Sequence, residues 1–170
     1  MKNFNFCPHC SSQNFNIANQ HRFSCEDCGF IYYHNVASAV AVIIKKENQL
    51  LFLKRNCNPK KGMLDLPGGF TDPKETAEET CVRELKEELN LDFNPQNFTY
   101  FTSFPNQYKY GKVTYHTADL IFITTLPEKA KIKLEKKEIQ AFQWVEKSNI
   151  ELEKIAFISL RNALKKYLES

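Results

Sequence analysis

The chain has 170 residues, which is enough for one domain of ordinary size and a small second module. Its formal net charge of +3 is too weak to indicate nucleic acid or an anionic membrane as a partner, and no apolar run reaches the roughly 20 residues of a membrane span. The first residues lack the long apolar stretch of a signal peptide, so we expect a cytoplasmic protein with no membrane partner.

Four of the six cysteines form two close pairs near the N-terminus. Cys7 and Cys10 make the first pair, and Cys25 and Cys28 make the second. In a cytosolic chain such pairs are typical of a metal site rather than of disulfides, and four thiolates suit the closed tetrahedral coordination of structural zinc. We therefore predict a zinc ribbon over residues 1–34. Redox-active pairs, or a site that has lost its metal, are the alternatives.

Residues 35–170 are expected to form one larger domain. Its first element is a buried strand over 36–44, a short run that is apolar except for Ser38. Asn48 and Gln49 mark a turn, and residues 50–53 are the expected partner strand of a hairpin.

The strongest helix signal follows a Pro-Gly-Gly bend at 67–69. Asp72 is predicted to cap the helix at its N-terminus, with Glu75 at the reciprocal position of a capping box. Apolar residues then recur at every fourth position, which favours an amphipathic helix packed on a core; these residues are Ala77, Cys81, Leu85 and Leu89. Asn90 stands where a left-handed residue commonly ends such a helix.

The C-terminal half predicts three more strands and a closing helix. The strands cover 98–104, 113–125 and 142–145, and a Tyr- and Lys-rich loop over 106–112 is expected to join the first two. An amphipathic pattern over 155–168 predicts the final helix.

An acidic cluster lies on the predicted helix after the bend. Glu84, Glu87 and Glu88 have the i, i+3, i+4 spacing that places three side chains on one helix face. Like charges at this spacing repel each other, whereas a bound divalent cation would hold them together. Carboxylate oxygens suit Mg²⁺ or Mn²⁺. A solvated acidic face is the alternative, and the glycine bend before the helix weighs against it.

The segment from Gly69 to Leu91 resembles the Nudix box. That box is a glycine, five residues, Glu, seven residues, Arg-Glu, an aliphatic residue, any residue, Glu-Glu, any residue, glycine and an aliphatic residue. Every defined position matches except the last glycine, which is Asn90 here, and Lys74 stands where many members have glycine. Four cysteines directly before such a domain are similar to the NADH pyrophosphatase branch. The resemblance implies an α/β fold, the α/β/α Nudix sandwich with a mixed β-sheet, preceded by the small zinc ribbon.

The resemblance also implies a hydrolase that uses water to split the phosphoanhydride of a nucleoside diphosphate linked to another moiety. Members of the family hold Mg²⁺ or Mn²⁺ with box glutamates, with a backbone carbonyl at the glycine bend and with a later acidic residue. The implied metal ligands are Gly68, Gly69, Glu84, Glu87, Glu88 and Glu138. The same four glutamates are the expected catalytic residues, and Glu87 and Glu138 are the two candidates for the general base. Glu75 and Arg83 are expected to support the site structurally.

Three aromatic residues are predicted to stack on a base of the substrate: Phe70, Phe104 and Tyr108. Core packing is the alternative for each of them. NADH or NAD⁺, ADP-ribose and nucleotide sugars are the expected substrate types. Of the Ser-Gln-Pro-Trp-Pro-Phe-Pro stretch typical of the NADH pyrophosphatase branch, only Ser103 and Pro105 are present. This departure weighs against NADH itself and against capped RNA.

A non-catalytic nucleotide sensor, or a nucleic-acid-binding module that uses the ribbon, is the competing interpretation. Non-catalytic members usually lose box carboxylates, whereas all three are present here. The ribbon carries only scattered cations, so a small nucleotide and not nucleic acid is the expected partner. The resemblance is compatible with a homodimer. Four basic residues of the last predicted helix are expected to form a solvated face: Lys154, Arg161, Lys165 and Lys166.

Overall fold

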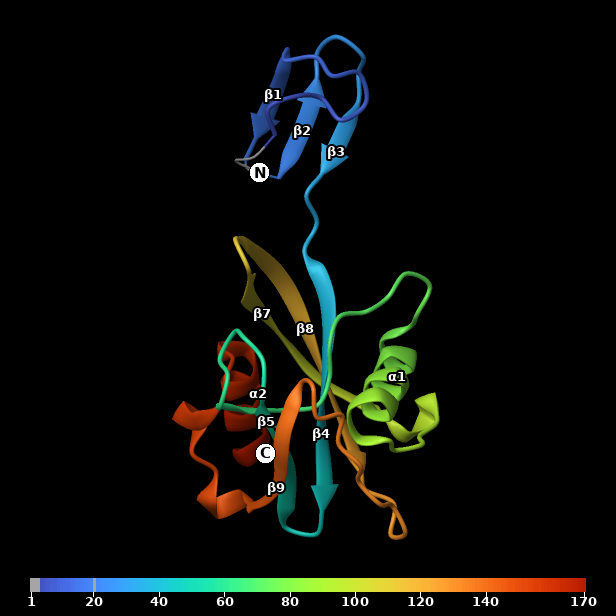
Figure 1. Ribbon diagram of the computed structural model, residues 1–170, viewed down its shortest axis with the longest axis vertical. Coiled ribbons are helices and arrows are strands. Elements are labelled where there is room, and N and C mark those ends of the chain that lie inside the picture. The colour runs from blue at the N-terminus through green and yellow to red at the C-terminus, as the bar shows by residue number, and fades with distance from the viewer. Residues whose placement is uncertain (1–3, 20) are drawn as a thin grey trace. The chain divides into compact units, whose positions relative to one another are not determined.

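The computed structural model describes residues 4–19 and 21–170. The chain divides into two compact units, Met1–Val36 and Ala37–Ser170, and both are drawn in Figure 1. Within the described residues, none of the helices has the length and apolar character needed to cross a membrane.

The first unit is a three-stranded antiparallel sheet in the order β1-β2-β3. Its strands are β1 (Phe15–Ala18), β2 (Arg22–Cys25) and β3 (Ile31–Tyr33). The core is small: Phe23 is fully buried, and Phe15 stacks on it at a ring-centroid distance of 4.8 Å. Cys7 and Cys25 complete the buried set. A unit with so little buried apolar surface gains little stability from its hydrophobic core.

The second unit contains a six-stranded mixed sheet. Its strands are β4 (Ala37–Lys46), β5 (Gln49–Arg55), β6 (Leu64–Asp65), β7 (Thr99–Tyr110), β8 (Val113–Thr125) and β9 (Ile139–Glu146). The order is β6-β5-β4-β8-β7, and β9 also pairs with β5. Strands β4 and β8 run parallel, whereas the other pairs are antiparallel. This confirms the expected mixed sheet.

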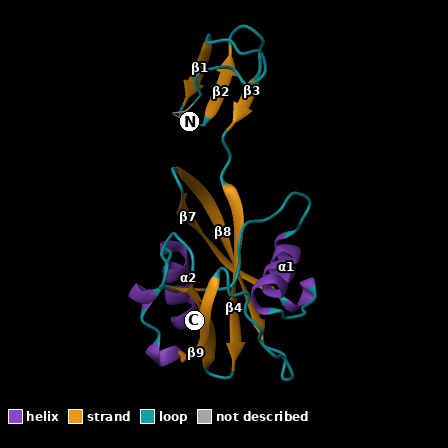
Figure 2. Ribbon diagram, in the orientation of Figure 1, coloured by secondary structure: helices purple, strands orange, loops and turns teal. Residues whose placement is uncertain are grey.

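Two helices, α1 (Ala77–Leu89) and α2 (Ile158–Leu168), cover opposite faces of this sheet (Figure 2). Residues 40–44 of strand β4 are buried on both faces of the sheet, which explains why this part of the strand is uninterruptedly apolar. Its residues Val40, Val42 and Ile44 pack in the core with α1. Its residues Ala41 and Ile43 pack in the core with α2. Short 3₁₀ turns connect the elements at Pro95–Asn97, Lys147–Asn149 and Leu152–Lys154.

The predicted start of the first helix is wrong by several residues. Helix α1 begins at Ala77, and Thr76 is its N-cap, with a capping box in which Thr76 Oγ1 accepts from the backbone N–H of Glu79 at 3.1 Å. Asp72 and Glu75 instead close a turn, because Lys74 has φ +78°, which no α-helix allows. The predicted C-terminus is confirmed: Asn90 is left-handed, with φ 54°.

The predicted loop over 106–112 is also wrong. Strand β7 continues to Tyr110, and the turn to β8 contains Gly111, which has φ +58°. Cross-strand pairing such as Tyr108 with Tyr115 holds this polar segment extended. The last helix begins at Ile158, three residues later than predicted.

The residues just before α2 remain extended because they join the sheet. Ile155 forms a parallel bridge with Leu64, and the backbone N–H of Ala156 donates to the Leu64 carbonyl at 2.8 Å. The chain therefore crosses the end of β6 before the helix can start.

Candidate active site

The Pro-Gly-Gly bend lies between β4 and α1, and there is no room for a side chain at either of its two glycines. Gly68 has φ +146°, and a Cβ atom added there would lie 2.2 Å from the carbonyl oxygen of Val40. A Cβ added to Gly69 would lie 2.4 Å from Oε1 of Glu84. The Gly69 carbonyl accepts from Val40 N–H at 2.8 Å, which fixes the bend along β4. Only glycine brings the backbone this close to the carboxylates of α1.

The carboxylates of α1 differ in their surroundings. Glu88 accepts from the backbone N–H of Gly68 at 3.0 Å. Burial raises the pKa of Glu88 well above its ordinary value, and repulsion from Glu84 and Glu138 raises it further. Burial also raises the pKa of Glu84, whose side chain is 13% exposed. Glu87 is 60% exposed and lies toward solvent. Of the three carboxylates of the box, Glu84 and Glu88 are therefore poorly solvated, whereas Glu87 is solvated.

Arg83 connects the helix to the bend. Its Nε and Nη2 atoms donate to the two carboxylate oxygens of Glu75 at 2.8 and 3.0 Å. Nη2 also donates to the Phe70 carbonyl at 2.9 Å, and Nη1 donates to Glu84 at 2.7 Å. Nη1 reaches Glu87 only at 3.4 Å. These bonds orient Glu84 and lower the pKa of Glu75 to about 2.

A cavity of about 370 Å³ opens in front of these groups. The predicted site residues that line it are Gly68, Gly69, Phe70, Arg83, Glu84, Glu88, Tyr108 and Glu138. Glu138 stands just before β9, where its carbonyl accepts from Asn56 N–H at 2.7 Å. Glu75 and Glu87 lie outside the lining. Phe104 also lies outside it and packs against the core under α2.

The cavity is surrounded by a glycine bend, an Arg-Glu pair and buried carboxylates of a helix. This arrangement is the one expected for the Nudix box. A family model described as the NUDIX domain matches residues 34–167. The chain belongs to the Nudix family. The crystal structure of a NUDIX hydrolase from Nitrosomonas europaea resembles this chain with a TM-score of 0.64 and 25% identity, covering 96% of this chain and 90% of that one.

Curated relatives match a shorter segment. The chain is 34% identical over 100 residues to the NAD-capped RNA hydrolase NudC of Vibrio parahaemolyticus, which covers 59% of this chain and 37% of that protein. It is 41% identical over 91 residues to the ADP-ribose pyrophosphatase of Methanocaldococcus jannaschii, covering 54% of this chain and 52% of that protein. The similarity therefore spans about a third to a half of the length of these relatives.

Aromatic rings of the Nudix domain gather at one side of the cavity, whose lining includes Phe70, Tyr108 and Phe157 but not Tyr115. Phe70 meets Tyr108 edge-to-face at a centroid distance of 5.6 Å, and it meets Tyr115 in the same way at 6.1 Å. Tyr108 also contacts Phe157 at 5.6 Å. Tyr115 was not among the predicted substrate contacts. Tyr115 pairs with Tyr108 across the β7–β8 hairpin. A prediction of the full length of this hairpin would therefore have placed Tyr115 beside Tyr108.

The cavity also contains an ion pair that the sequence did not reveal. Arg55 Nη1 donates to Oδ2 of Asp65 at 2.5 Å, and both side chains are only 12% exposed. Burial raises the pKa of Asp65 to about 6, even though Arg55 acts in the opposite direction. Arg55 Nε also donates to the Pro59 carbonyl at 2.8 Å. A rigid guanidinium thus lies in the same cavity as the glutamates.

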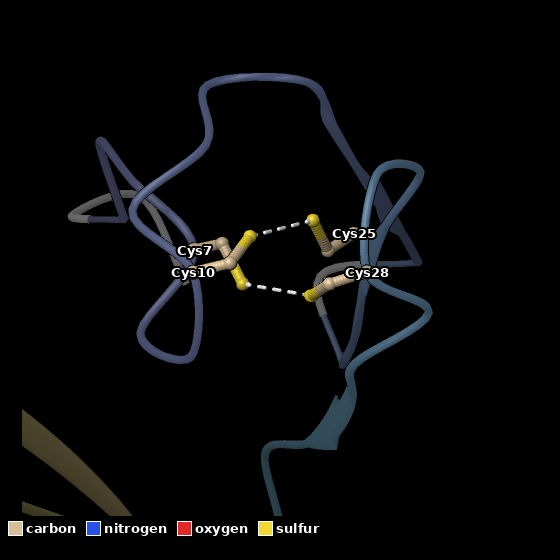
Figure 3. Close-up of side chains that lie close together, drawn as sticks. All are labelled: Cys7, Cys10, Cys25 and Cys28. Atoms are coloured by element: carbon tan, nitrogen blue, oxygen red, sulfur yellow. Dashed lines mark hydrogen bonds between the residues drawn. The ribbon is translucent and has the colours of Figure 1, made fainter.

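The four paired cysteines meet in the first unit (Figure 3). Their sulfur atoms all lie within 4.8 Å of one another, with Cys7 Sγ 3.7 Å from Cys28 Sγ and Cys10 Sγ 3.6 Å from Cys25 Sγ. A tetrahedral zinc ion with Zn–S bonds of about 2.3 Å would separate sulfurs by about 3.8 Å. Among the described residues, no other group of three or more such ligand atoms lies so close together.

Proposed function

We propose that the protein is a metal-dependent pyrophosphohydrolase acting on a nucleoside diphosphate linked to another moiety. One observation supports this most directly: Glu84, Glu88 and Glu138 all line one cavity beside a glycine bend. Membership of the Nudix family and relatives named as hydrolases agree with it. A non-catalytic sensor would have no need to keep these carboxylates buried against one another.

The donor set fits a hard divalent cation. Burial and repulsion from neighbouring carboxylates raise the pKa values of Glu84 and Glu88, and Arg83 is the cation that bonds to Glu84. A divalent ion would offset this crowding of negative charge. Oxygen ligands suit Mg²⁺ or Mn²⁺. We assign Glu84, Glu88 and the Gly68 carbonyl as ligands, because the Gly69 carbonyl already accepts from Val40.

When bound, the cations would neutralise the anhydride and lower the pKa of a nearby water. The residues of the chain would then orient the substrate and supply an acceptor for the proton of the attacking water. We assign the general base to Glu138, since Glu138 lines the cavity and Glu87 does not. Glu138 takes a proton as the water oxygen bonds to one phosphorus and the anhydride P–O bond breaks. The products are two phosphorylated fragments.

Arg55 and the aromatic rings would hold the substrate. Arg55, fixed by Asp65, places positive charge where a phosphate group can approach. Phe70, Tyr108 and Tyr115 offer ring surfaces on which a base can stack. The relatives named NAD-capped RNA hydrolase and ADP-ribose pyrophosphatase point to substrates of the NAD or ADP-ribose type.

We also propose that the four cysteines of the first unit hold one structural zinc ion. Their sulfur spacing fits tetrahedral coordination, and four thiolates leave no open position for a substrate. Gly29 supports the second pair: it has φ +72°, and its N–H donates to the Cys25 carbonyl at 3.1 Å.

The experiment that tests the function is a panel of NAD⁺, NADH, ADP-ribose and nucleotide sugars with Mg²⁺ or Mn²⁺, scored for the released mononucleotide. The Glu88→Gln variant keeps the shape of the side chain and removes its charge. We expect about a 10³-fold loss of turnover in this variant. Absence of turnover on every substrate, or full activity of the variant, would refute the proposal.

A further inference from the structure

Asp119 of β8 is a buried carboxylate in the wall of the active-site cavity. Both of its oxygens accept short hydrogen bonds: Oδ1 from the hydroxyl of Thr117 and Oδ2 from the hydroxyl of Ser159, each at 2.6 Å. Thr117 and Ser159 are themselves buried, so the carboxylate is held in one orientation. Thr117 also lines the cavity, whereas Ser159 belongs to the first turn of α2 and lies outside the lining.

The hydrogen-bond partners of Asp119 are neutral. None of the ion pairs between described residues involves Asp119, whereas Asp65 is paired with Arg55. Burial raises the pKa of Asp65, and repulsion from Asp119 raises it further, so the two carboxylates lie near each other. Taking a carboxylate out of water is costly unless hydrogen bonds replace its hydration. Each carboxylate oxygen can accept two such bonds, so Asp119 can accept more from a ligand in the cavity.

The β7–β8 hairpin places other polar and aromatic side chains beside Asp119. Asp119 and Thr117 share one face of β8, because side chains two residues apart in a strand point the same way. Asn106 is the partner of Thr117 on β7, and Tyr108 is the next residue of β7 on this face. All four residues line the cavity. Successive positions on one face are about 7 Å apart, which is close to the distance from a nucleoside base to its ribose hydroxyls.

We propose that Asp119 accepts hydrogen bonds from the ribose hydroxyls of the substrate, and that it makes the enzyme selective for ribonucleotides over deoxyribonucleotides. This inference rests on the proposed function of the cavity. With the base on the ring of Tyr108, the ribose lies beside Thr117 and directs its hydroxyls to Asp119. The 5′-phosphate can then reach Arg55, whose partner Asp65 lies near Asp119.

A ribose diol suits this carboxylate better than a cationic group does. The N-terminal end of a helix carries partial positive charge, and Ser159 bonds to Asp119 from that end of α2. The helix therefore offsets part of the negative charge, and hydrogen-bond donors are what the site can still use. Carboxylates recognise ribose hydroxyls in the same way in dinucleotide-binding folds. A deoxyribose would leave an acceptor of this buried group unfilled.

Binding of nucleoside monophosphates tests this role without any requirement for catalysis. The probes are AMP, 2′-deoxy-AMP and 3′-deoxy-AMP, titrated by calorimetry in the presence of Mg²⁺. We expect the wild type to bind AMP about tenfold more tightly than at least one deoxy form, as loss of one hydrogen bond to a charged group predicts. Asp119→Asn keeps the shape of the side chain and should bring the three affinities within about threefold of one another.

Failure of the wild type to bind AMP, or equal affinities for the three probes, would overturn the proposal. These two outcomes need no variant, so they decide the matter even if Asp119→Asn does not fold. A preference for AMP over IMP that disappears in Asp119→Asn would place the carboxylate beside the base instead of the ribose, which would also overturn it.

Ser159→Ala is the matched control, because Asp119 also joins β8 to α2. This variant removes the hydrogen bond between the two elements and leaves the carboxylate in place. We expect it to unfold at a lower urea concentration than the wild type and to keep the preference for AMP. An equal loss of that preference in Ser159→Ala and Asp119→Asn would show a structural role only, against the proposal.

A kinetic comparison separates this inference from the hydrolase itself. The two substrates are ADP-ribose and its analogue built on the deoxyadenosine that binds more weakly as the monophosphate. We expect the ratio of kcat/KM for ADP-ribose to kcat/KM for the analogue to exceed one in the wild type and to fall toward one in Asp119→Asn. A wild-type ratio of one would contradict the role of Asp119 while the hydrolase remains. Failure to cleave either compound would count against the hydrolase, and the AMP titrations would then decide the role of Asp119 alone.

Discussion

The backbone N–H of Gly68 donates to Oε2 of Glu88 at 3.0 Å, which ties the glycine bend to a carboxyl group whose pKa is raised by burial. The two residues are twenty positions apart: Gly68 lies in the loop between β6 and α1, and Glu88 lies in α1. Because Gly68 also lies against β4, this single contact connects the sheet, the bend and α1. The position of the Glu88 carboxylate therefore depends on how tightly the bend is packed.

Gly68→Ala should destabilise the protein and abolish hydrolysis. The new Cβ would clash with the Val40 carbonyl, and alanine rarely adopts φ +146°. We expect a loss of about 3 kcal/mol in the free energy of unfolding, measured with urea. Gly111→Ala is the control, since it has φ +58° but no atom within 4 Å of its Cβ. It should lose only about 1 kcal/mol. Equal losses would show that the packing of Gly68 is unimportant.

Glu75 gives the stability a predictable dependence on pH. Arg83 lowers the pKa of Glu75 from 4.5 to about 2, so the folded state favours the ionised form. This contribution is fully present above pH 4.5 and is lost as the pH falls toward 2. Glu75→Gln should be less stable than the wild type at pH 6, and the difference should shrink as the pH falls below about 4.5. Urea unfolding at each pH measures it.

The exposed Glu87→Gln variant serves as the control for this pH series. It should stay close to the wild type throughout, because Arg83 lies 3.4 Å from Glu87 and solvent surrounds that carboxylate. A Glu75→Gln difference that does not change with pH would contradict the role given to the Arg83–Glu75 pair.

Glu138→Gln should lower kcat by about 10²- to 10³-fold, because it removes the proton acceptor. Glu87→Gln should retain kcat within about threefold, since Glu87 lies outside the cavity. A larger loss in Glu87→Gln than in Glu138→Gln would reverse the assignment of the base.

Loss of zinc should follow from substitution of the clustered cysteines. Elemental analysis of the purified protein should find one zinc ion per chain, and Cys25→Ser should lose it together with the near-ultraviolet signal of the ribbon aromatics. Cys57→Ser should keep the metal, because Cys57 belongs to the second unit and lies outside the cluster. Full zinc content in Cys25→Ser would contradict the four-thiolate site.

Much of the fold could be predicted because it is encoded locally. Residues 40–44 of strand β4 are continuously apolar because both faces of the strand are buried there, and α1 carries an apolar stripe because one of its faces packs on the sheet. The spacing of Glu84 and Glu88 also placed them on one helix face. The extension of β7 through Tyr110 could not be predicted in this way, because its polar residues are held by pairing with β8.

The parts of the site that were missed depend on contacts between distant segments. Arg55 is an ordinary arginine at the end of a strand, and only its pairing with Asp65 makes it a buried cation in the cavity. Tyr115 reaches Phe70 because the β7–β8 hairpin extends to the bend. Lys60, Lys109 and Arg161 likewise come together from a loop, a strand and a helix. None of these proximities is visible in the spacing of residues along one segment.

The most direct test of the account is the binding of Mn²⁺ in solution, followed by the electron paramagnetic resonance signal of the free ion. The wild type should bind Mn²⁺, and Glu87→Gln should bind it equally well. The Glu84→Gln/Glu88→Gln variant should bind at least about 100-fold more weakly, since it loses both proposed carboxylate ligands. Unchanged Mn²⁺ affinity in this double variant would contradict the claim that these two side chains hold the metal.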